Sequence, residues 1–255
     1  MKNKENRTLI MESFCQSGPT DRLNLGCRRG FTLVELLVVM AMFSLVMAGI
    51  YSVFVRSNRV YLSQEQVVAA QQEARSALDI LGREIRMAGF IATNNQPGGF
   101  DLITASAWAG NADSAIEIAT VDAAAKTTTF AFKSDLDGDG RTDAVRYIYY
   151  HSDHVTADRR NTLYREVLTW DGPSGGWDGA GEQLFLENIE SLTFAYQNAD
   201  GTPPTETPAN LDDIRGVVIR LMARTATEVE PYQGGKDFRY RELVSNIQIR
   251  NLGLS

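Results

Sequence analysis

The chain has 255 residues, which is room for one domain of ordinary size plus an appendage, or for two small domains. Hydrophobic residues make up 44% and charged residues 22%, a globular composition that excludes wholesale disorder. The formal net charge of −7 argues against a nucleic-acid partner, because binding to phosphate backbones depends on clustered Lys and Arg. Two His and two Cys leave little scope for metal, thiol or proton-relay catalysis.

The charge is unevenly distributed along the chain. Residues 1–30 hold six basic and three acidic groups, which give +3, and residues 31–255 hold 19 basic and 29 acidic groups, which give −10. Both cysteines, Cys15 and Cys27, also lie in the first stretch. If that stretch is removed, the remainder has no thiol and cannot form a disulfide.

A long apolar run follows the basic N-terminal stretch. The 25 residues 31–55 carry one charge, that of Glu35, and about 20 apolar residues suffice for a helix to cross the hydrocarbon layer. Arg28 and Arg29 directly precede the run. By the positive-inside tendency they predict a cytoplasmic N-terminus and an exported body. A cleaved secretory signal is the alternative, but its apolar region covers only about 7–15 residues.

Glu35 is unexpected, since a carboxylate inside an apolar helix costs roughly 2.5–3.5 kcal/mol on insertion scales and normally marks a function. If the chain were cut between Gly30 and Phe31, the new α-amino group would lie about one helical turn from Glu35. The amine of a neighbouring subunit could then pair with Glu35 in the apolar layer. The alternative is an ordinary signal anchor whose Glu35 lies at headgroup level.

The sequence from Arg29 to Leu37, RGFTLVELL, resembles the class III signal of type IV pilins and type II secretion pseudopilins. The resemblance implies that a prepilin peptidase cuts after Gly30 and methylates Phe31, and that Glu35 guides the docking of subunits. It makes residues 1–30 a leader peptide. This leader is long for the family, although a start at Met11 would shorten it.

Helical periodicity continues beyond the apolar run. Apolar residues recur at intervals of seven, four and three, at Val60, Val67, Ala74, Leu78, Leu81, Ile85 and Ala88. The pattern predicts one helix over about 31–88, roughly 85 Å long. It would have a transmembrane half at 31–55 and an extracytoplasmic stem at 56–89, and would end at Gly89 and the Gln96–Gly99 turn. A coiled coil is the alternative.

From about Phe90 the apolar period changes to two, which predicts a β-rich head over 90–255. No helical crossover separates the predicted strands. We therefore expect an α+β fold, with an antiparallel sheet packed on the stem helix, as the pilin resemblance also implies. The connections 171–181 and 199–210 are expected to be loops. The strands are predicted at Ala115–Val121, Thr127–Lys133, Ala144–His151, Leu163–Trp170, Ser191–Asn198, Gly216–Arg224 and Leu243–Arg250.

An acidic loop lies between two of these strands. Its carboxylates occupy loop positions 1, 3, 5 and 9, and a glycine stands at position 6, which is a spacing that suits Ca²⁺. Position 7 would contribute a backbone carbonyl, and position 12 is Arg146 rather than a bidentate Glu. A solvated hairpin turn is the alternative. The predicted ligands are Asp135, Asp137, Asp139, Arg141 and Asp143.

No catalytic motif is found. His151 and His154 are expected at the surface, and Trp108, Trp170, Trp177 and the Tyr147–Tyr150 run are expected in the core rather than on a sugar-binding face. The sequence lacks the nucleophile elbow, the H-E-x-x-H zinc motif and the phosphate-binding glycine loop. We therefore do not expect an enzyme.

Within the family, the spacing of the head resembles the PilW minor pilins and the J-type pseudopilins, on weaker motifs than the N-terminal one. The resemblance implies a minor pilin that helps to assemble or prime a type IV pilus. Its implied partners are the prepilin peptidase, other minor and major pilins, the inner-membrane assembly platform and a tip adhesin. The chain would be a single-pass inner-membrane protein with a periplasmic head, later moved into a pilus or pseudopilus. A J-type pseudopilin and a membrane-tethered adhesive module are the alternatives.

Overall fold

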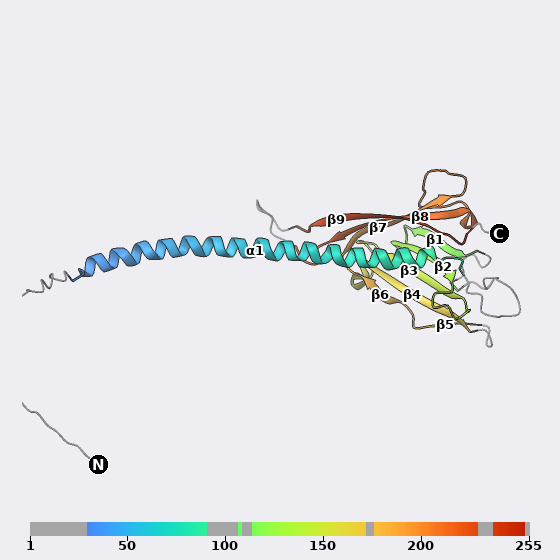
Figure 1. The fold of residues 1–255 in the computed structure, drawn as a ribbon, viewed down its shortest axis with the longest axis horizontal. Helices are drawn as coiled ribbons and strands as arrows, with labels where there is room; N and C mark the ends of the chain where they lie inside the picture. Colours follow the sequence, from blue (N-terminus) through green and yellow to red (C-terminus); the bar gives the residue numbers. More distant parts are fainter. Residues whose placement is uncertain (1–29, 91–106, 109–113, 172–175, 229–236, 253–255) are drawn as a thin grey trace, which may run out of the picture. The chain divides into compact units, whose positions relative to one another are not determined.

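The computed structural model describes residues 30–90, 107–108, 114–171, 176–228 and 237–252 (Figure 1). It divides into two compact units, Met1–Phe54 and Val55–Ser255. One helix, α1 (Leu33–Arg86), passes from the first unit into the second. Of the expected leader, only Gly30 lies within the described residues.

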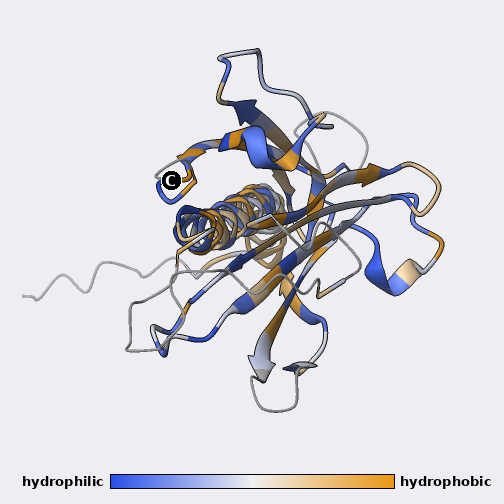
Figure 2. Ribbon diagram, turned by 90° about the vertical axis from the view of Figure 1, so that its right-hand side faces the viewer, coloured by the Kyte–Doolittle hydropathy of each residue, from blue (hydrophilic) through white to orange (hydrophobic). Residues whose placement is uncertain are grey.

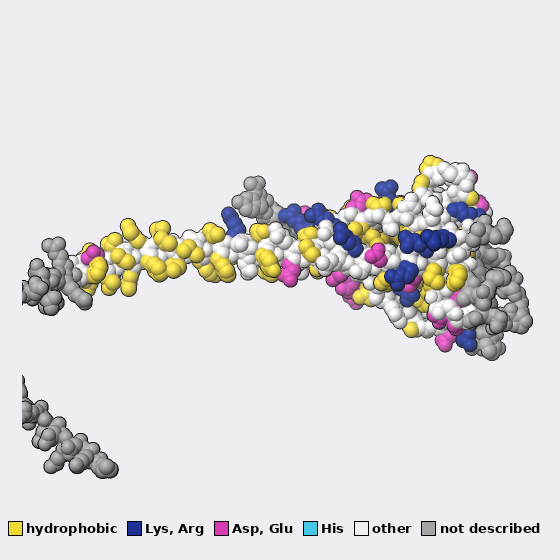
Figure 3. Space-filling model, viewed as in Figure 1, with side chains coloured by type: hydrophobic (Ala, Val, Ile, Leu, Met, Phe, Trp, Pro, Cys, Tyr) yellow, Lys and Arg dark blue, Asp and Glu magenta, His cyan; other side chains and the backbone are white. Residues whose placement is uncertain are grey.

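In the first unit, α1 is apolar on every side. All side chains from Phe31 to Phe54 are exposed (Figure 3). Within the described part of the chain, α1 is the one helix long and apolar enough to cross a membrane. A helix that is hydrophobic all round needs an apolar surrounding. This agrees with the membrane segment predicted at 31–55.

In the second unit, only one stripe of α1 is apolar and buried. Its members are Ala74, Ala77, Leu78, Leu81, Gly82 and Ile85. Most of the predicted stripe is thus confirmed, but Val60 is 45% exposed and Val67 is half-buried. The difference arises because the head covers the stem fully only from about Ala74 onward, although Thr227 already contacts Gln66. Full burial of a side chain such as Leu81 contributes roughly 1.5–3 kcal/mol.

The helix ends as the sequence predicts. After Arg86 the backbone tightens into a turn, with the Met87 amide donating to the Glu84 carbonyl at 3.0 Å. Gly89 then adopts a φ of +78° and donates its amide to the Lys133 carbonyl at 2.9 Å. A Cβ at Gly89 would lie 3.0 Å from Leu252, so a larger residue fits poorly there. The expected turn at 96–99 lies outside the described residues.

The head contains two antiparallel sheets rather than the single one expected. The first has the order β1-β2-β3-β4-β5, with β6 also paired to β4, and the second has the order β7-β8-β9. The strands are β1 (Ile116–Asp122), β2 (Thr127–Ser134), β3 (Asp143–Tyr150), β4 (Thr162–Asp171), β5 (Gly176–Gly179), β6 (Gln183–Leu186), β7 (Ile189–Asn198), β8 (Ile214–Arg224) and β9 (Tyr240–Gln248). Two short 3-10 helices, η1 (Ala157–Arg159) and η2 (Leu211–Asp213), complete the described elements.

The α+β class and all seven predicted strands are confirmed. The expectation of one sheet is wrong because Asn188, with a φ of +58°, turns the chain between β6 and β7. Seen end-on, the stem half of α1 lies between the two sheets, so that each covers one side of its apolar stripe (Figure 2). The expectation of a loop over 171–181 is also wrong in part, because this segment contains β5.

A half-buried polar contact fixes the stem against the first sheet. The Glu84 carboxylate of α1 accepts two hydrogen bonds from Arg165 of β4, at 3.0 Å and 2.8 Å. It also accepts one from the Tyr147 hydroxyl of β3. Burial and the neighbouring Glu84 charge raise the pKa of Tyr147, so the phenol keeps its proton and remains a donor.

We predict that Glu84→Ala destabilises the head by about 2–4 kcal/mol, because it leaves the Arg165 cation and the Tyr147 hydroxyl without their acceptor. All three tryptophans lie in the head, so tryptophan fluorescence during denaturation of the detergent-solubilised full chain measures this loss. Asp79→Ala is the matched control, since Asp79 lies on the exposed face of the same helix. Equal midpoints for the two variants would contradict the prediction.

Candidate functional site

The residues around the expected cleavage point lie immediately before α1. Gly30 and Phe31 are outside the helix, and Phe31 is 81% exposed. The Thr32 hydroxyl accepts a hydrogen bond at 3.2 Å from the backbone amide of Glu35. Thr32 is thus the N-cap of α1, and Thr32 and Glu35 have the T-x-x-E spacing of a capping box.

This arrangement gives Glu35 a local role as well as the docking role that the family resemblance implies. Its carboxylate lies in the first turn of α1, where a negative charge is stabilised by the positive end of the helix dipole. The Gly30–Phe31 bond remains in non-helical backbone two residues before the helix. The bond expected to be cut therefore lies in the short non-helical segment directly before a continuous helix.

The comparisons with known proteins address this same segment. A family model described as the prokaryotic N-terminal methylation motif matches residues 26–51. The chain carries the type IV pilin and pseudopilin signature. No curated protein matches the chain.

The signature indicates a type IV pilin-like or pseudopilin precursor. It implies processing by a prepilin peptidase and assembly with other pilins in a membrane, and the apolar helix near the N-terminus supports membrane anchoring. Proteins of this class are structural rather than enzymatic. The expected family resemblance is thus confirmed at the level of the superfamily.

The acidic loop is the second candidate site, in the hairpin between β2 and β3. Carboxylate oxygens of Asp135, Asp137 and Asp143 lie within 4.8 Å of one another. Asp135 and Asp143 are buried and Asp137 is exposed. Asp139 is outside this group, and one of its oxygens accepts from the Arg141 amide at 2.7 Å. The structure therefore brings together three of the four predicted carboxylates.

Backbone amides already hold the buried carboxylates in position. Asp135 accepts from the amides of Gly138 at 2.7 Å and Gly140 at 3.0 Å. Asp143 accepts from the Leu136 amide at 3.0 Å and the Thr169 hydroxyl at 2.6 Å. Burial raises the pKa of the Asp143 carboxyl, and the charges of Asp137 and Asp139 raise it further. Bringing these carboxylates together costs free energy through charge repulsion and burial, and a bound cation would relieve that cost.

The donor set fits a hard cation. Each carboxylate offers about four lone-pair directions, so the amide contacts leave acceptor capacity on Asp135 and Asp143. Three oxygen ligands are fewer than the 6–8 that Ca²⁺ takes, so backbone carbonyls or waters would complete the shell. Arg146, at the twelfth loop position, forms ion pairs with Glu166 and Glu182 and takes no part in the site.

The structure corrects the surface placement of His154. His154 is only 8% exposed, because its ring packs edge-on against Tyr150 with 4.7 Å between ring centroids. His151 is half-buried and lies 2.9 Å from the Thr128 hydroxyl. Burial lowers the pKa of His151, which favours the neutral ring. Neither imidazole belongs to a metal-ligand group among the described residues.

The aromatic side chains divide into two groups. Tyr147, Tyr149 and Tyr150 are buried as predicted. The three tryptophans are half-buried, so their assignment to the core is wrong. Trp170 and Trp177 pack edge-to-face across β4 and β5, while the Trp108 indole donates to Glu166 at 3.0 Å. They cover the margin of the first sheet instead of filling the core.

Sequence inspection missed two structural features. The first is the cap residue Thr32, which could have been recognised from its T-x-x-E spacing with Glu35. The second feature is a fully buried ion pair between Lys133 of β2 and Glu117 of β1, with 3.7 Å between Nζ and Oε1. Burial raises the pKa of Glu117, whereas Lys133 and the Ala107 amide lower it. Nothing in the local sequence indicated this pair, because it forms only through the β1–β2 register.

We predict that Gly30→Leu abolishes processing, so that the isolated chain keeps its leader and lacks a methylated Phe31. A Cβ at Gly30 would meet nothing within 4 Å, and the substitution should therefore leave the fold intact. Gly49→Leu is the matched control, because Gly49 is equally open and lies within α1. N-terminal mass spectrometry measures both variants. A Phe31 N-terminus on the Gly30→Leu chain would contradict the prediction.

Proposed function

We propose that the protein is a minor pilin that takes part in assembling or priming a type IV pilus. The observation that carries this proposal is the RGFTLVELL segment, which the methylation-motif model matches and whose residues from Leu33 onward begin a continuous helix. Cleavage after Gly30 leaves a chain anchored by its own N-terminal helix. Its exposed apolar surface, Phe31 to Phe54, can pass from lipid to the apolar core of a filament.

Glu35 has a defined task in this proposal. After cleavage, the carboxylate of one subunit pairs with the α-amino group of Phe31 in a neighbouring subunit, which sets the axial stagger between them. Pairing in an apolar layer stabilises only a well-aligned geometry, since each unpaired charge is costly there. The capping box holds Glu35 in the first turn, at a fixed separation from the new N-terminus.

The minor role rests on the head. The head is acidic and carries long loops. Such a subunit suits a few copies at a tip or in a priming complex. The resemblance of the head to the PilW minor pilins supports this assignment, and the J-type pseudopilins of type II secretion are the second candidate because their heads share the same spacing.

Deletion of the gene in its own host separates these roles. We predict loss of sheared surface pili with unchanged release of folded proteins to the medium, restored by the wild-type gene. Complementation with Glu35→Gln should yield a processed subunit that leaves the pili absent. Loss of protein release with normal pili would instead identify a pseudopilin, and no change in either would favour a tethered binding module.

We further propose that the acidic loop binds Ca²⁺ as a structural ion. At 1 mM Ca²⁺ and a dissociation constant near 10⁻⁴ M, binding should stabilise the head by about 1.4 kcal/mol relative to chelator. Asp137→Asn should remove this difference, because it takes away one of the three converging carboxylates. Asp158→Asn, an exposed carboxylate in η1, is the control that should retain it. Equal wild-type unfolding midpoints in calcium and chelator would refute the site.

A further inference from the structure

Among the described residues, the cations of the first sheet are neutralised, whereas several arginines on α1 and around β9 are not. Every Lys and Arg described between residues 114 and 171, in the first sheet and its loops, has a carboxylate or carbonyl partner. By contrast, a set of arginines on α1, on β9 and just beyond β9 has no ion pair among the described residues. Its members are Arg75, Arg83, Arg86, Arg241 and Arg250.

Figure 3 shows Lys and Arg side chains along the boundary between the stem half of α1 and the second sheet, with a few Asp and Glu side chains among them. Residues 31–255 carry a net charge of −10, so this mainly basic boundary is opposite in sign to the rest of the mature chain. Clustered guanidinium groups repel one another unless an anion lies nearby.

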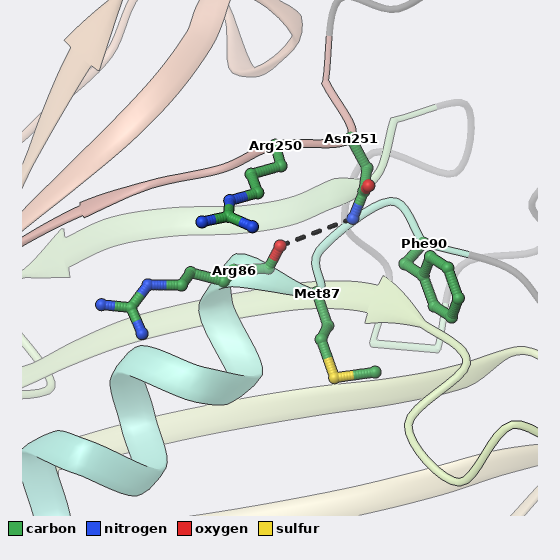
Figure 4. Close-up of a pocket in the computed structure, with 5 residues that line it drawn as sticks. All are labelled: Arg86, Met87, Phe90, Arg250 and Asn251. Carbon is green, nitrogen blue, oxygen red and sulfur yellow. Dashed lines mark hydrogen bonds between the residues drawn. The ribbon is translucent and has the colours of Figure 1, made fainter.

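An open pocket of about 510 Å³ lies at the distal end of this boundary. It is lined by Arg86, Met87, Phe90, Arg250 and Asn251 (Figure 4). Both guanidinium groups point to the same side, and Met87 and Phe90 lie toward the other. Between them, the Asn251 amide donates to the Arg86 carbonyl at 3.4 Å. The pocket thus has a cationic half and an apolar half separated by a polar bridge.

The helix dipole does not account for this arrangement. Basic residues in a last helical turn stabilise the negative end of the dipole, which would explain Arg83 and Arg86 alone. Arg250, however, follows β9 and reaches the same place from 164 residues further along the chain. The Asn251 amide, not a guanidinium group, lies against the Arg86 and Ala88 carbonyls.

We propose that this pocket docks an acidic, amphipathic segment of a neighbouring protein subunit. Carboxylates of the segment would pair with Arg86 and Arg250, for which the planar guanidinium fork is well suited. An apolar side chain of the same segment would cover Met87 and the 38% exposed ring of Phe90. The inference rests on the proposed function, because it assigns the contact through which one subunit holds the head of another.

Two other classes of anionic partner fit the pocket less well. Single-stranded nucleic acid binds to rows of aromatic side chains, and Phe90 is the one aromatic residue among the described residues that line the pocket. The distance between the pocket and the end of the apolar run argues against a lipid headgroup. Arg86 lies 31 residues beyond Val55, where the apolar run ends, which is roughly 45 Å along α1. An apolar and cationic pocket far from the apolar segment favours a polypeptide.

Site-specific photo-crosslinking of the full chain in its own host tests the proposal. A photo-reactive benzoylphenylalanine replaces Phe90, or Val155 as the control, since Val155 is 86% exposed and lies on the loop before η1. We expect a crosslink from position 90 that mass spectrometry assigns to a protein segment containing Asp or Glu beside an apolar residue. Position 155 should give no such product.

Charge-reversal variants make the test specific to the pocket. Combined Arg86→Glu and Arg250→Glu should lower the crosslink yield at least tenfold, whereas Arg75→Glu, on the same helix but outside the pocket, should change it less than twofold. Tryptophan fluorescence during denaturation verifies that each variant folds.

The result distinguishes failure of this proposal from failure of the proposed function. An absent crosslink, a crosslink to lipid, polysaccharide or nucleic acid, or a yield insensitive to Arg86 and Arg250 overturns the docking site. If processing at Gly30 and pilus assembly persist in such a case, the proposed function stands. If deletion leaves pili and protein release intact, the proposed function fails whatever the crosslink shows.

Discussion

The head is organised around the buried stripe of α1. Leu81 and Ile85 are fully excluded from solvent, and Phe130, Phe194 and Ile247 from both sheets belong to the same core. Gly82 is also buried in this stripe and faces the Ile247 side chain of β9. The two sheets have no strand in common, and they meet both through this helix and through direct contacts such as Phe130 of β2 against Phe194 and Tyr196 of β7. The stem therefore serves as the central element of the head as well as its link to the membrane segment.

The packing of the head around the buried stripe explains why the exposed surface of α1 changes from apolar to polar along the helix. Up to Phe54 the helix exposes apolar side chains on all sides, and from about Ala74 it exposes mainly polar ones. Glu84 adds a polar contact to this apolar packing and fixes the rotation of the helix against β3 and β4. Apolar packing alone tolerates sliding and rotation, whereas a bidentate contact with Arg165 has one preferred geometry.

The sequence was informative where local periodicity or a short motif determined the outcome. The long helix, the seven main strands and the Gly30–Glu35 segment follow from spacing within a few residues. The division into two sheets depended on the left-handed turn at Asn188, and β5 was hidden in a glycine-rich stretch that resembles a loop. The Lys133–Glu117 pair and the Arg86–Arg250 pocket depend on register and tertiary contact, which no linear pattern encodes.

The cap at Thr32 has a consequence for proteolysis. A peptidase that binds extended backbone on both sides of its target bond finds only Phe31 and Thr32 outside the helix after that bond, before α1 begins. Further access requires unwinding of the first turn, and the Thr32–Glu35 hydrogen bond opposes this fraying. In the proposed processing, cleavage after Gly30 and fraying of the first helical turn are therefore coupled, and the start of α1 limits how far the enzyme can bind along the chain.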